Sequence, residues 1–151
     1  MLTVEPKLIE QYVKTGKVKM IFRDVLNHGE RSLRTSEAAA CADQQGLFWQ
    51  MHEILFERQN EVWGTSGTDA LVALMNTYGK QVPKLDSNAL NLCLRSNATL
   101  KQLQTADAEQ RTRGITSQPI FEISSKGTTR RIAGRQSFEV FSTAIDALLK
   151  S

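Results

Sequence analysis

Hydrophobic residues near the start of the chain follow a helical period and then an alternating one. In residues 6–15 the apolar positions form one stripe along a helix, which Pro6 suits as a first residue and Gly16 as an end. Residues 18–24 alternate partly between apolar and polar positions, and Ile21 adds apolar surface to the second face. The pattern predicts a helix followed by a largely buried strand.

The middle of the chain is helical in period, and the end returns to strands. We expect helices over residues 37–45, 47–59, 68–78 and 97–113, a loop over 63–67, and a short helix that Asp86 or Ser87 caps. Residues 119–124 and 128–133 have the character of short strands around a turn at 125–127, and a last helix follows Ser137. This order predicts an α/β fold class with a helical insertion.

Length, composition and charge narrow the classes of protein. The chain has 151 residues, of which 40% are hydrophobic and 23% charged, as expected for one globular domain with an insertion. The net charge is +3 and the basic residues form no run, so we expect no nucleic-acid partner. No stretch approaches the roughly 18 apolar residues of a membrane span, and the first 12 residues lack the pattern of a signal peptide.

Two cysteines, Cys41 and Cys93, and two histidines, His28 and His52, limit the available chemistry. There is no Cys-x-x-Cys, no phosphate-binding loop and no dinucleotide fingerprint. A zinc-protease motif beginning at His52 would need a second histidine where Phe56 stands. We therefore expect no catalytic motif, no metal site and no cofactor.

Four stretches follow one another along the chain: EPKLIEQYVKTGKVKMIFRD, EAAACADQQGLFWQMHEILFE, GITSQPIFEI and IAGRQSFEVFSTAIDALL. Together they resemble the DsbA-like thiol–disulfide oxidoreductases, a bacterial family with a thioredoxin fold and an inserted helical domain. The resemblance implies a thioredoxin-like core of residues 1–27 and 114–151, with a helical insertion over 28–113. The first strand of the family is missing, because it precedes the helix that opens this chain.

The stretch ITSQP, residues 115–119, matches the family's motif Val/Ile-Thr-x-x-Pro. The resemblance implies a cis peptide bond before Pro119, which turns the chain and leaves the preceding backbone free to pair with a peptide. It also implies that Gln118 and Pro119 bind substrate and that the partners are protein or peptide thiols. The residues alone leave open an ordinary trans proline that starts an edge strand.

The family's Cys-x-x-Cys has no counterpart here, because the helix that would follow it starts at residues 3–6 without a thiol. We therefore expect a chain that is redox-inactive and has no catalytic residue. A gene fragment, a trimmed chain and a natural non-redox derivative remain as explanations. The alternative function is a non-catalytic module for peptide or protein binding or for assembly. The resemblance implies a location outside the cytoplasm.

Cys41 and Cys93 both fall at apolar positions of expected helices in the insertion. The resemblance favours a disulfide between them, since related exported proteins can carry a second bridge that joins insertion helices. Such a bridge would close a loop of about 50 residues, which the chain-entropy model values at roughly 4 kcal/mol. The alternative is two buried free thiols that act as small hydrophobic residues.

The resemblance also bears on the oligomeric state. In the implied fold, the missing strand lies between the strand at residues 18–24 and the one that starts at Pro119. Its absence would leave two inner strand edges with unpaired backbone groups, and open edges promote pairing with another chain. We therefore expect a homodimer that forms through these sheet edges.

Overall fold

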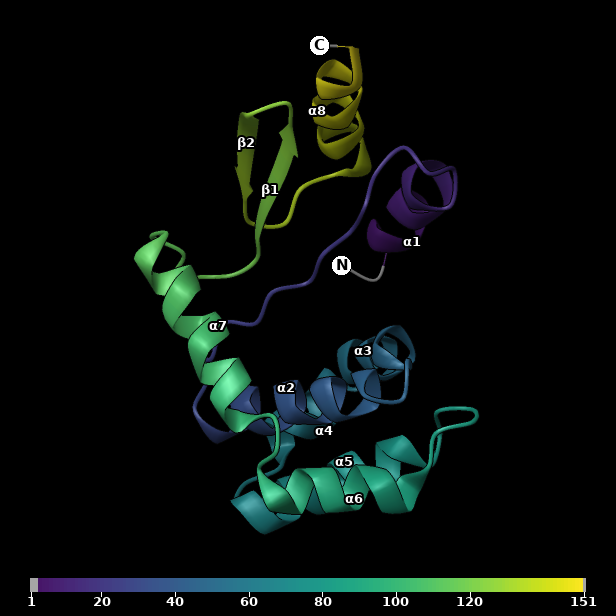
Figure 1. Cartoon of the computed structure of the whole chain (residues 1–151), viewed down its shortest axis with the longest axis vertical. Coiled ribbons are helices and arrows are strands. Elements are labelled where there is room, and N and C mark those ends of the chain that lie inside the picture. Colours follow the sequence, from purple (N-terminus) through teal and green to yellow (C-terminus); the bar gives the residue numbers. More distant parts are fainter. Residues whose placement is uncertain (1–2, 151) are drawn as a thin grey trace. The chain divides into compact units, whose positions relative to one another are not determined.

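The structure, a computed structural model, describes residues 3–150. The chain forms two compact units, one made of Met1–Arg23 with Ile115–Ser151 and the other of Asp24–Gly114. The second unit begins four residues before the expected insertion over 28–113 and ends one residue after it. Both chain crossings between the units lie outside helices and strands (Figure 1).

The first unit holds a short helical segment, a β-hairpin and a long C-terminal helix. α1 (Glu5–Leu8) runs directly into a π-helical turn, η1 (Ile9–Val13), so the predicted helix is present with a wider last turn. β1 (Ile120–Ser125) pairs antiparallel with β2 (Thr128–Ala133), and α8 (Phe138–Lys150) packs against β1 (Figure 1).

The hairpin turns at Lys126 and Gly127, whose φ angles are 46° and 83°. Positive φ at both central residues is the condition for the two-residue turn whose twist matches that of antiparallel strands. The register pairs Ser125 with Thr128 beside the turn and Ile120 with Ala133 at the far end. The predicted hairpin is therefore confirmed. Its turn consists of residues 126–127, because Ser125, expected in the turn, belongs to β1.

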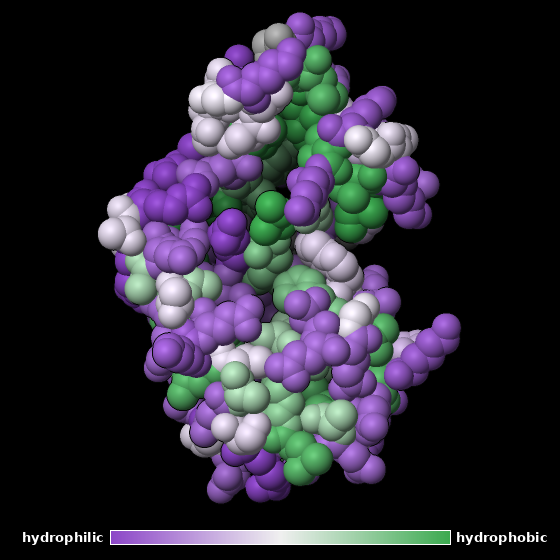
Figure 2. All heavy atoms as spheres, in the orientation of Figure 1, coloured by the Kyte–Doolittle hydropathy of each residue, from purple (hydrophilic) through white to green (hydrophobic). Residues whose placement is uncertain are grey.

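One face of the hairpin closes a small hydrophobic core. Leu8, Tyr12, Phe141 and Ile145 are buried there, and Phe121, Ile123 and Ile132 of the hairpin pack against them. The rings of Phe121 and Phe141 meet edge to face with centroids 4.7 Å apart, a favourable aromatic geometry. In Figure 2, hydrophobic side chains are visible over α1 and α8, the two helices that supply this core.

The strand predicted at residues 18–24 is absent from the structure, which gives this segment no regular structure. Its burial still alternates, with Val18, Met20 and Phe22 partly buried, but Ile21 is 58% exposed. A strand needs a neighbouring strand for its backbone groups, and in the described part of the chain the sheet consists of β1 and β2. The predicted alternation of buried and exposed side chains is present, but the predicted strand is wrong.

The second unit is a helical block. Its helices are α2 (Glu30–Asp43), α3 (Phe48–Glu57), α4 (Gln59–Gly64), α5 (Thr68–Gly79), α6 (Ser87–Ser96) and α7 (Leu100–Thr112). α2 packs against α3, α5, α6 and α7. The loop expected over 63–67 is shorter, because α4 continues to Gly64, and the helix expected from residue 97 begins at Leu100. Asn97 instead ends α6 in the left-handed conformation, with φ 51°.

The core of this unit surrounds the alanine-rich face of α2. Small side chains on that face let the neighbouring helices approach closely, and larger ones from α3, α5 and α6 fill the space between them. The largest fully buried side chains include Met51, Leu71, Met75, Tyr78 and Leu90. The phenol of Tyr78 is satisfied by the Glu61 carboxylate at 3.2 Å.

Candidate functional site

The ITSQP stretch lies in the first unit, immediately before β1. Ile115 is buried, Gln118 is exposed and Pro119 is partly buried. The peptide bond between Gln118 and Pro119 is cis, as the resemblance implies. The carbonyl of Pro119 accepts a hydrogen bond from the backbone N–H of Gly134 at 2.9 Å, which extends the β1–β2 pairing by one residue pair.

This hydrogen bond settles which backbone groups of β1 face away from β2. In an antiparallel pair, directly opposed residues alternate between hydrogen-bonded and non-hydrogen-bonded pairs. Pro119 and Gly134 form a hydrogen-bonded pair, so the next pair, Ile120 with Ala133, is not hydrogen-bonded. The N–H and C=O groups of Ile120, Glu122 and Ser124 therefore point to the other side of β1, which we call the free β1 edge. Within residues 3–150 no strand occupies it.

The side chains near the free β1 edge carry little unpaired charge. Glu122 receives hydrogen bonds from Nε and Nη2 of Arg131, its cross-strand neighbour, at 3.2 and 2.9 Å. Opposite charges on facing strand positions favour this register. With the carboxylate neutralised across the strands, the edge offers mainly backbone donors and acceptors to an incoming chain.

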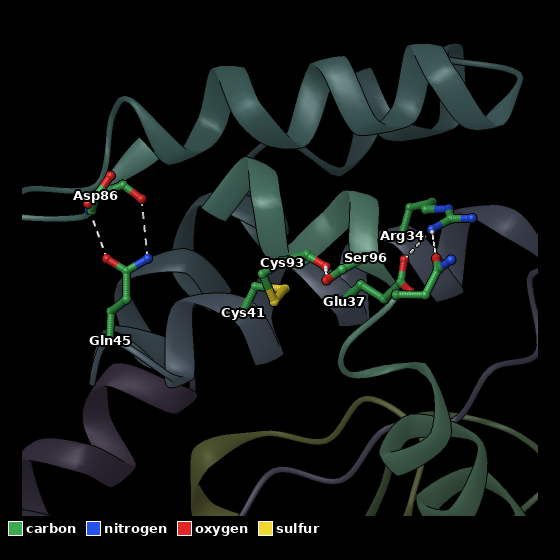
Figure 3. The surroundings of a disulfide bond; sticks show 8 residues. Arg34, Glu37, Cys41, Gln45, Asp86, Cys93 and Ser96 are labelled. Atoms are coloured by element: carbon green, nitrogen blue, oxygen red, sulfur yellow. Dashed lines mark hydrogen bonds and ion pairs between the residues drawn. A yellow bond between two sulfur atoms is a disulfide. The ribbon is translucent and has the colours of Figure 1, made fainter. Parts of the chain in front are cut away.

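The second unit holds the two cysteines, joined as a disulfide with their Cα atoms 5.9 Å apart. Cys41 belongs to α2 and Cys93 to α6, so the bridge ties the two helices together (Figure 3). Cys41 is 1% exposed, whereas Cys93 is partly exposed. The alternative of two free thiols does not occur in this structure.

Two polar contacts lie one on each side of the disulfide, one made from α2 and one from the turn that follows it (Figure 3). Toward the start of α6, the Gln45 amide accepts from the backbone N–H of Asp86 at 2.8 Å and donates to its carbonyl at 3.2 Å. Toward the end of α6, Nη1 of Arg34 donates to Asn97 Oδ1 at 3.2 Å. We call this line of contacts the α2–α6 seam.

Glu37 is the buried acid of the α2–α6 seam. It is 1% exposed, and its Oε2 accepts from Nη1 of Arg34 at 2.6 Å. Its Oε1 is buried and has no hydrogen-bond partner among the described residues. Burial raises the pKa of the Glu37 carboxyl above its ordinary value, although the Arg34 guanidinium pulls it down.

The residues predicted as functional thus fall in separate units: Gln118 and Pro119 in the first, Cys41 and Cys93 in the second. Sequence reasoning missed Glu37 and Gln45, and the signal for Glu37 was its place four residues before Cys41 on one helix. In the described part of the chain, no three His, Cys, Asp or Glu side chains gather as a metal site would require. Nor is any described helix long and apolar enough to cross a bilayer.

The expectation of a redox-inactive chain is not supported, because the structure contains a disulfide, which is itself a reducible group. That expectation rested on the missing Cys-x-x-Cys and took the remaining cysteines for structural residues.

Comparisons with known proteins give the family. The thioredoxin family model described as "Thioredoxin" matches residues 1–147. No curated protein sequence shows a significant match. Among solved structures, the chain is similar to oxidised BdbD from Bacillus subtilis, at 21% identity and a TM-score of 0.81, over 99% of this chain and 78% of that one. The thioredoxin-like fold expected from the sequence is confirmed, and the chain belongs to the thioredoxin family.

Proposed function

We propose that this chain binds extended segments of thiol-containing proteins by strand addition along the free β1 edge, beside Gln118 and Pro119. It would supply the substrate-recognition function of a thiol–disulfide oxidoreductase. The observation that carries the proposal is the side of β1 that faces away from β2, toward which the backbone groups of Ile120, Glu122 and Ser124 point and which no described strand occupies, directly after the family's substrate-binding motif.

Strand addition fits the chemistry of this edge. An incoming extended peptide gains main-chain hydrogen bonds, each with a net worth of about 0.5–1.5 kcal/mol, and it needs no particular side chain to gain them. Gln118 is exposed and lies on the far side of the cis peptide bond to Pro119, at the end of β1 where an incoming chain would begin to pair. Such an edge suits partners that are diverse in sequence and locally unfolded.

Family membership supports protein thiols as the partners. The sequence has no Cys-x-x-Cys, so the proposal assigns peptide recognition to this unit and gives no exchange step to Gln118 or Pro119. The substrate residues before and after a cysteine would pair with the backbone of β1, which would hold that cysteine near the cis-proline segment of residues 115–119.

A matched pair of proline variants tests the proposal. In Glu122→Pro the substitution removes an N–H that points to the free β1 edge, and the β1–β2 hydrogen bonds remain. Arg131→Pro removes the equivalent outward N–H of β2 and breaks the same ion pair. The readout is fluorescence anisotropy of a labelled, unstructured peptide that carries one cysteine, and circular dichroism verifies that both variants fold.

The proposal expects wild type and Arg131→Pro to bind with similar affinity, and Glu122→Pro to bind about tenfold more weakly, as the loss of one to two hydrogen bonds implies. Equal weakening in both variants, or unchanged binding in Glu122→Pro, would contradict it.

We further propose that without a peptide two copies pair through the same edge. Two β1 strands running antiparallel about a two-fold axis would satisfy each other's backbone groups, which is the isologous arrangement typical of dimers. The sequence leads us to expect a homodimer through two strand edges. Since residues 18–24 form no strand, this proposal places the pairing on the β1 edge alone.

A further inference from the structure

The two cysteines of the disulfide differ in exposure to solvent. Cys41 is 1% exposed within the core of the helical unit. Cys93 on α6 is partly exposed. A thiolate opens a disulfide by attacking the sulfur that it can reach. An external thiol therefore meets Cys93 first, and Cys41 is the leaving group.

The α2–α6 seam would hold the two sulfurs together after the bridge opens. Gln45 keeps two hydrogen bonds to the Asp86 backbone at one end of α6, and Arg34 keeps one to Asn97 at the other. None of these contacts involves sulfur (Figure 3). The reduced cysteines would stay opposite each other, which favours closure of the same bridge.

Cys41 would leave as a buried thiolate, and a buried charge needs a compensating group. Glu37 lies one helical turn before Cys41 on the same face of α2, and side chains four residues apart are neighbours on a helix. Its Oε1 is buried and has no hydrogen-bond partner among the described residues. Since burial raises the pKa of this carboxyl, its protonated form persists to higher pH than in an exposed glutamate.

Few other titratable groups turn inward near Glu37. On α2 itself, Arg34 lowers and Glu30 raises its pKa. Of the elements packed on α2, α6 carries Arg95, which is exposed, and α5 carries exposed Asp69 and buried Tyr78. The inward groups of α3 and α7 are His52, ringed by aromatic side chains, and Asp107, which pairs with Arg111.

We propose that Cys41–Cys93 is a reversible thiol–disulfide site that low-molecular-weight thiols enter through Cys93, with Glu37 exchanging a proton with Cys41. A thiolate attacks Sγ of Cys93, and the S–S bond breaks with its electron pair on Sγ of Cys41. Glu37 gives its proton to that sulfur and becomes a carboxylate beside Arg34. A second thiolate then attacks the mixed disulfide, which releases the small-molecule disulfide and a Cys93 thiolate that takes a proton from water. Two small thiols are oxidised, and one protein disulfide is reduced.

The site of attack is tested first, on the oxidised wild-type chain without denaturant. Reduced glutathione is added, the reaction is quenched with N-ethylmaleimide, and peptide mass spectrometry locates both modifications. The proposal expects glutathione on Cys93 and maleimide on Cys41, with about tenfold or greater preference, because exchange follows access. Glutathione mainly on Cys41, or reaction only after urea unfolds the chain, would overturn the proposal.

The role of Glu37 is tested by the pH profile of the same reaction. Glu37→Gln keeps the shape and removes the titrating proton, and Glu30→Gln is the matched control, because Glu30 also contacts Arg34 but is exposed. Rates are corrected for the thiolate fraction of glutathione. Glu37→Gln should flatten the profile. Glu30→Gln should keep the wild-type shape but move it to lower pH, because Glu30 raises the pKa of Glu37. An unchanged profile in Glu37→Gln would exclude Glu37 as the proton partner. Should Glu37→Gln not fold, the site of glutathione attachment in wild type still decides the proposal.

Discussion

Gln45 and Asp86 exchange two hydrogen bonds across the α2–α6 seam, through the side-chain amide of Gln45 and the backbone N–H and C=O of Asp86. Glu37 and Cys41 lie four residues apart on α2, and Gln45 continues this row in the turn that follows the end of the helix at Asp43. Each contact of the seam is made from this row or from Arg34 beside it. α2 and the turn after it thus combine a disulfide with polar contacts at both ends of α6.

Asp86 also caps α6, and this makes a first prediction. Its Oδ1 accepts from the backbone N–H groups of Asn88 and Ala89 at 2.8 and 3.1 Å. Asp86→Ala should lower the free energy of unfolding by about 1 kcal/mol, the usual cost of losing a cap. Asp86→Asn should keep most of the stability, since Asn is an equally good cap. Both tryptophans, Trp49 and Trp63, lie in this unit, so urea unfolding followed by their fluorescence reports on it. Equal losses in the two variants would contradict the capping account.

A second prediction concerns alkaline pH. Burial, together with the nearby Glu61 carboxylate, raises the pKa of Tyr78 to about 12. An unfolded tyrosine ionises near pH 10, so the native state holds this proton more tightly than the unfolded state does. The resulting stability is fully present below about pH 10 and is lost as the pH rises through about 12.

The measurement of this shift uses the small number of tyrosines, since Tyr12 is the other one in the chain. In a Tyr12→Phe background, phenolate absorbance at 295 nm reports on Tyr78 alone. Its midpoint should lie near 12 in the folded protein. The loss of stability above pH 10 should be smaller in Tyr78→Phe than in wild type. A midpoint near 10 in protein that is still folded would contradict the prediction.

A third prediction concerns the first unit. The Tyr12 hydroxyl donates to Oδ1 of Asp146 on α8 at 2.9 Å. Tyr12→Phe keeps the buried ring and removes this bond, so the free energy of unfolding should fall by about 0.5–1.5 kcal/mol. Unfolding of this unit is followed by NMR signals of β1 and α8, because it contains no tryptophan. A control, Thr143→Val, changes an exposed α8 residue and should alter stability by less than about 0.5 kcal/mol.

A fourth prediction is self-association through the free β1 edge. Light scattering coupled to size exclusion, at roughly 10–100 μM protein, should give the mass of a dimer for wild type and for Arg131→Pro. Glu122→Pro should give a monomer, because it removes an edge donor and leaves the hairpin intact. A monodisperse wild-type monomer over this range would show the dimer proposal wrong. If Glu122→Pro were still a dimer, the dimer interface would not lie on the free β1 edge.

The sequence predicted correctly those features that depend on residues close together in the chain, such as turns and helix caps. The hairpin is predictable because Lys126-Gly127 provides the positive φ angles of its turn between two alternating segments. Asp86 was one of two candidate caps, and its side chain makes the capping bonds. Residues 18–24 show the limit, since their alternating burial is present without a strand. A strand requires a partner from elsewhere in the chain, and no local pattern reports on one.

The candidate sites likewise include residues that could be predicted and residues that could not. The cysteine pairing and the Gln118–Pro119 motif come from resemblance, which carries long-range information that composition lacks. Glu37 escaped notice because an acid within a helix is usually solvated. Its burial depends on Arg34 and on the end of α6 at Asn97, 60 residues further along the chain, a contact that no local window contains.

Hydrogen–deuterium exchange at single amides tests the central claim, peptide binding along the free β1 edge, most directly. The measurement compares dilute protein, in which the monomer predominates, with and without the single-cysteine peptide. The account predicts slower exchange at Ile120, Glu122 and Ser124, whose N–H groups face the incoming strand, and no change at Thr129 and Arg131 on the outer edge of β2. Bound peptide with unchanged exchange at the three β1 amides, or with protection on β2 instead, would contradict it.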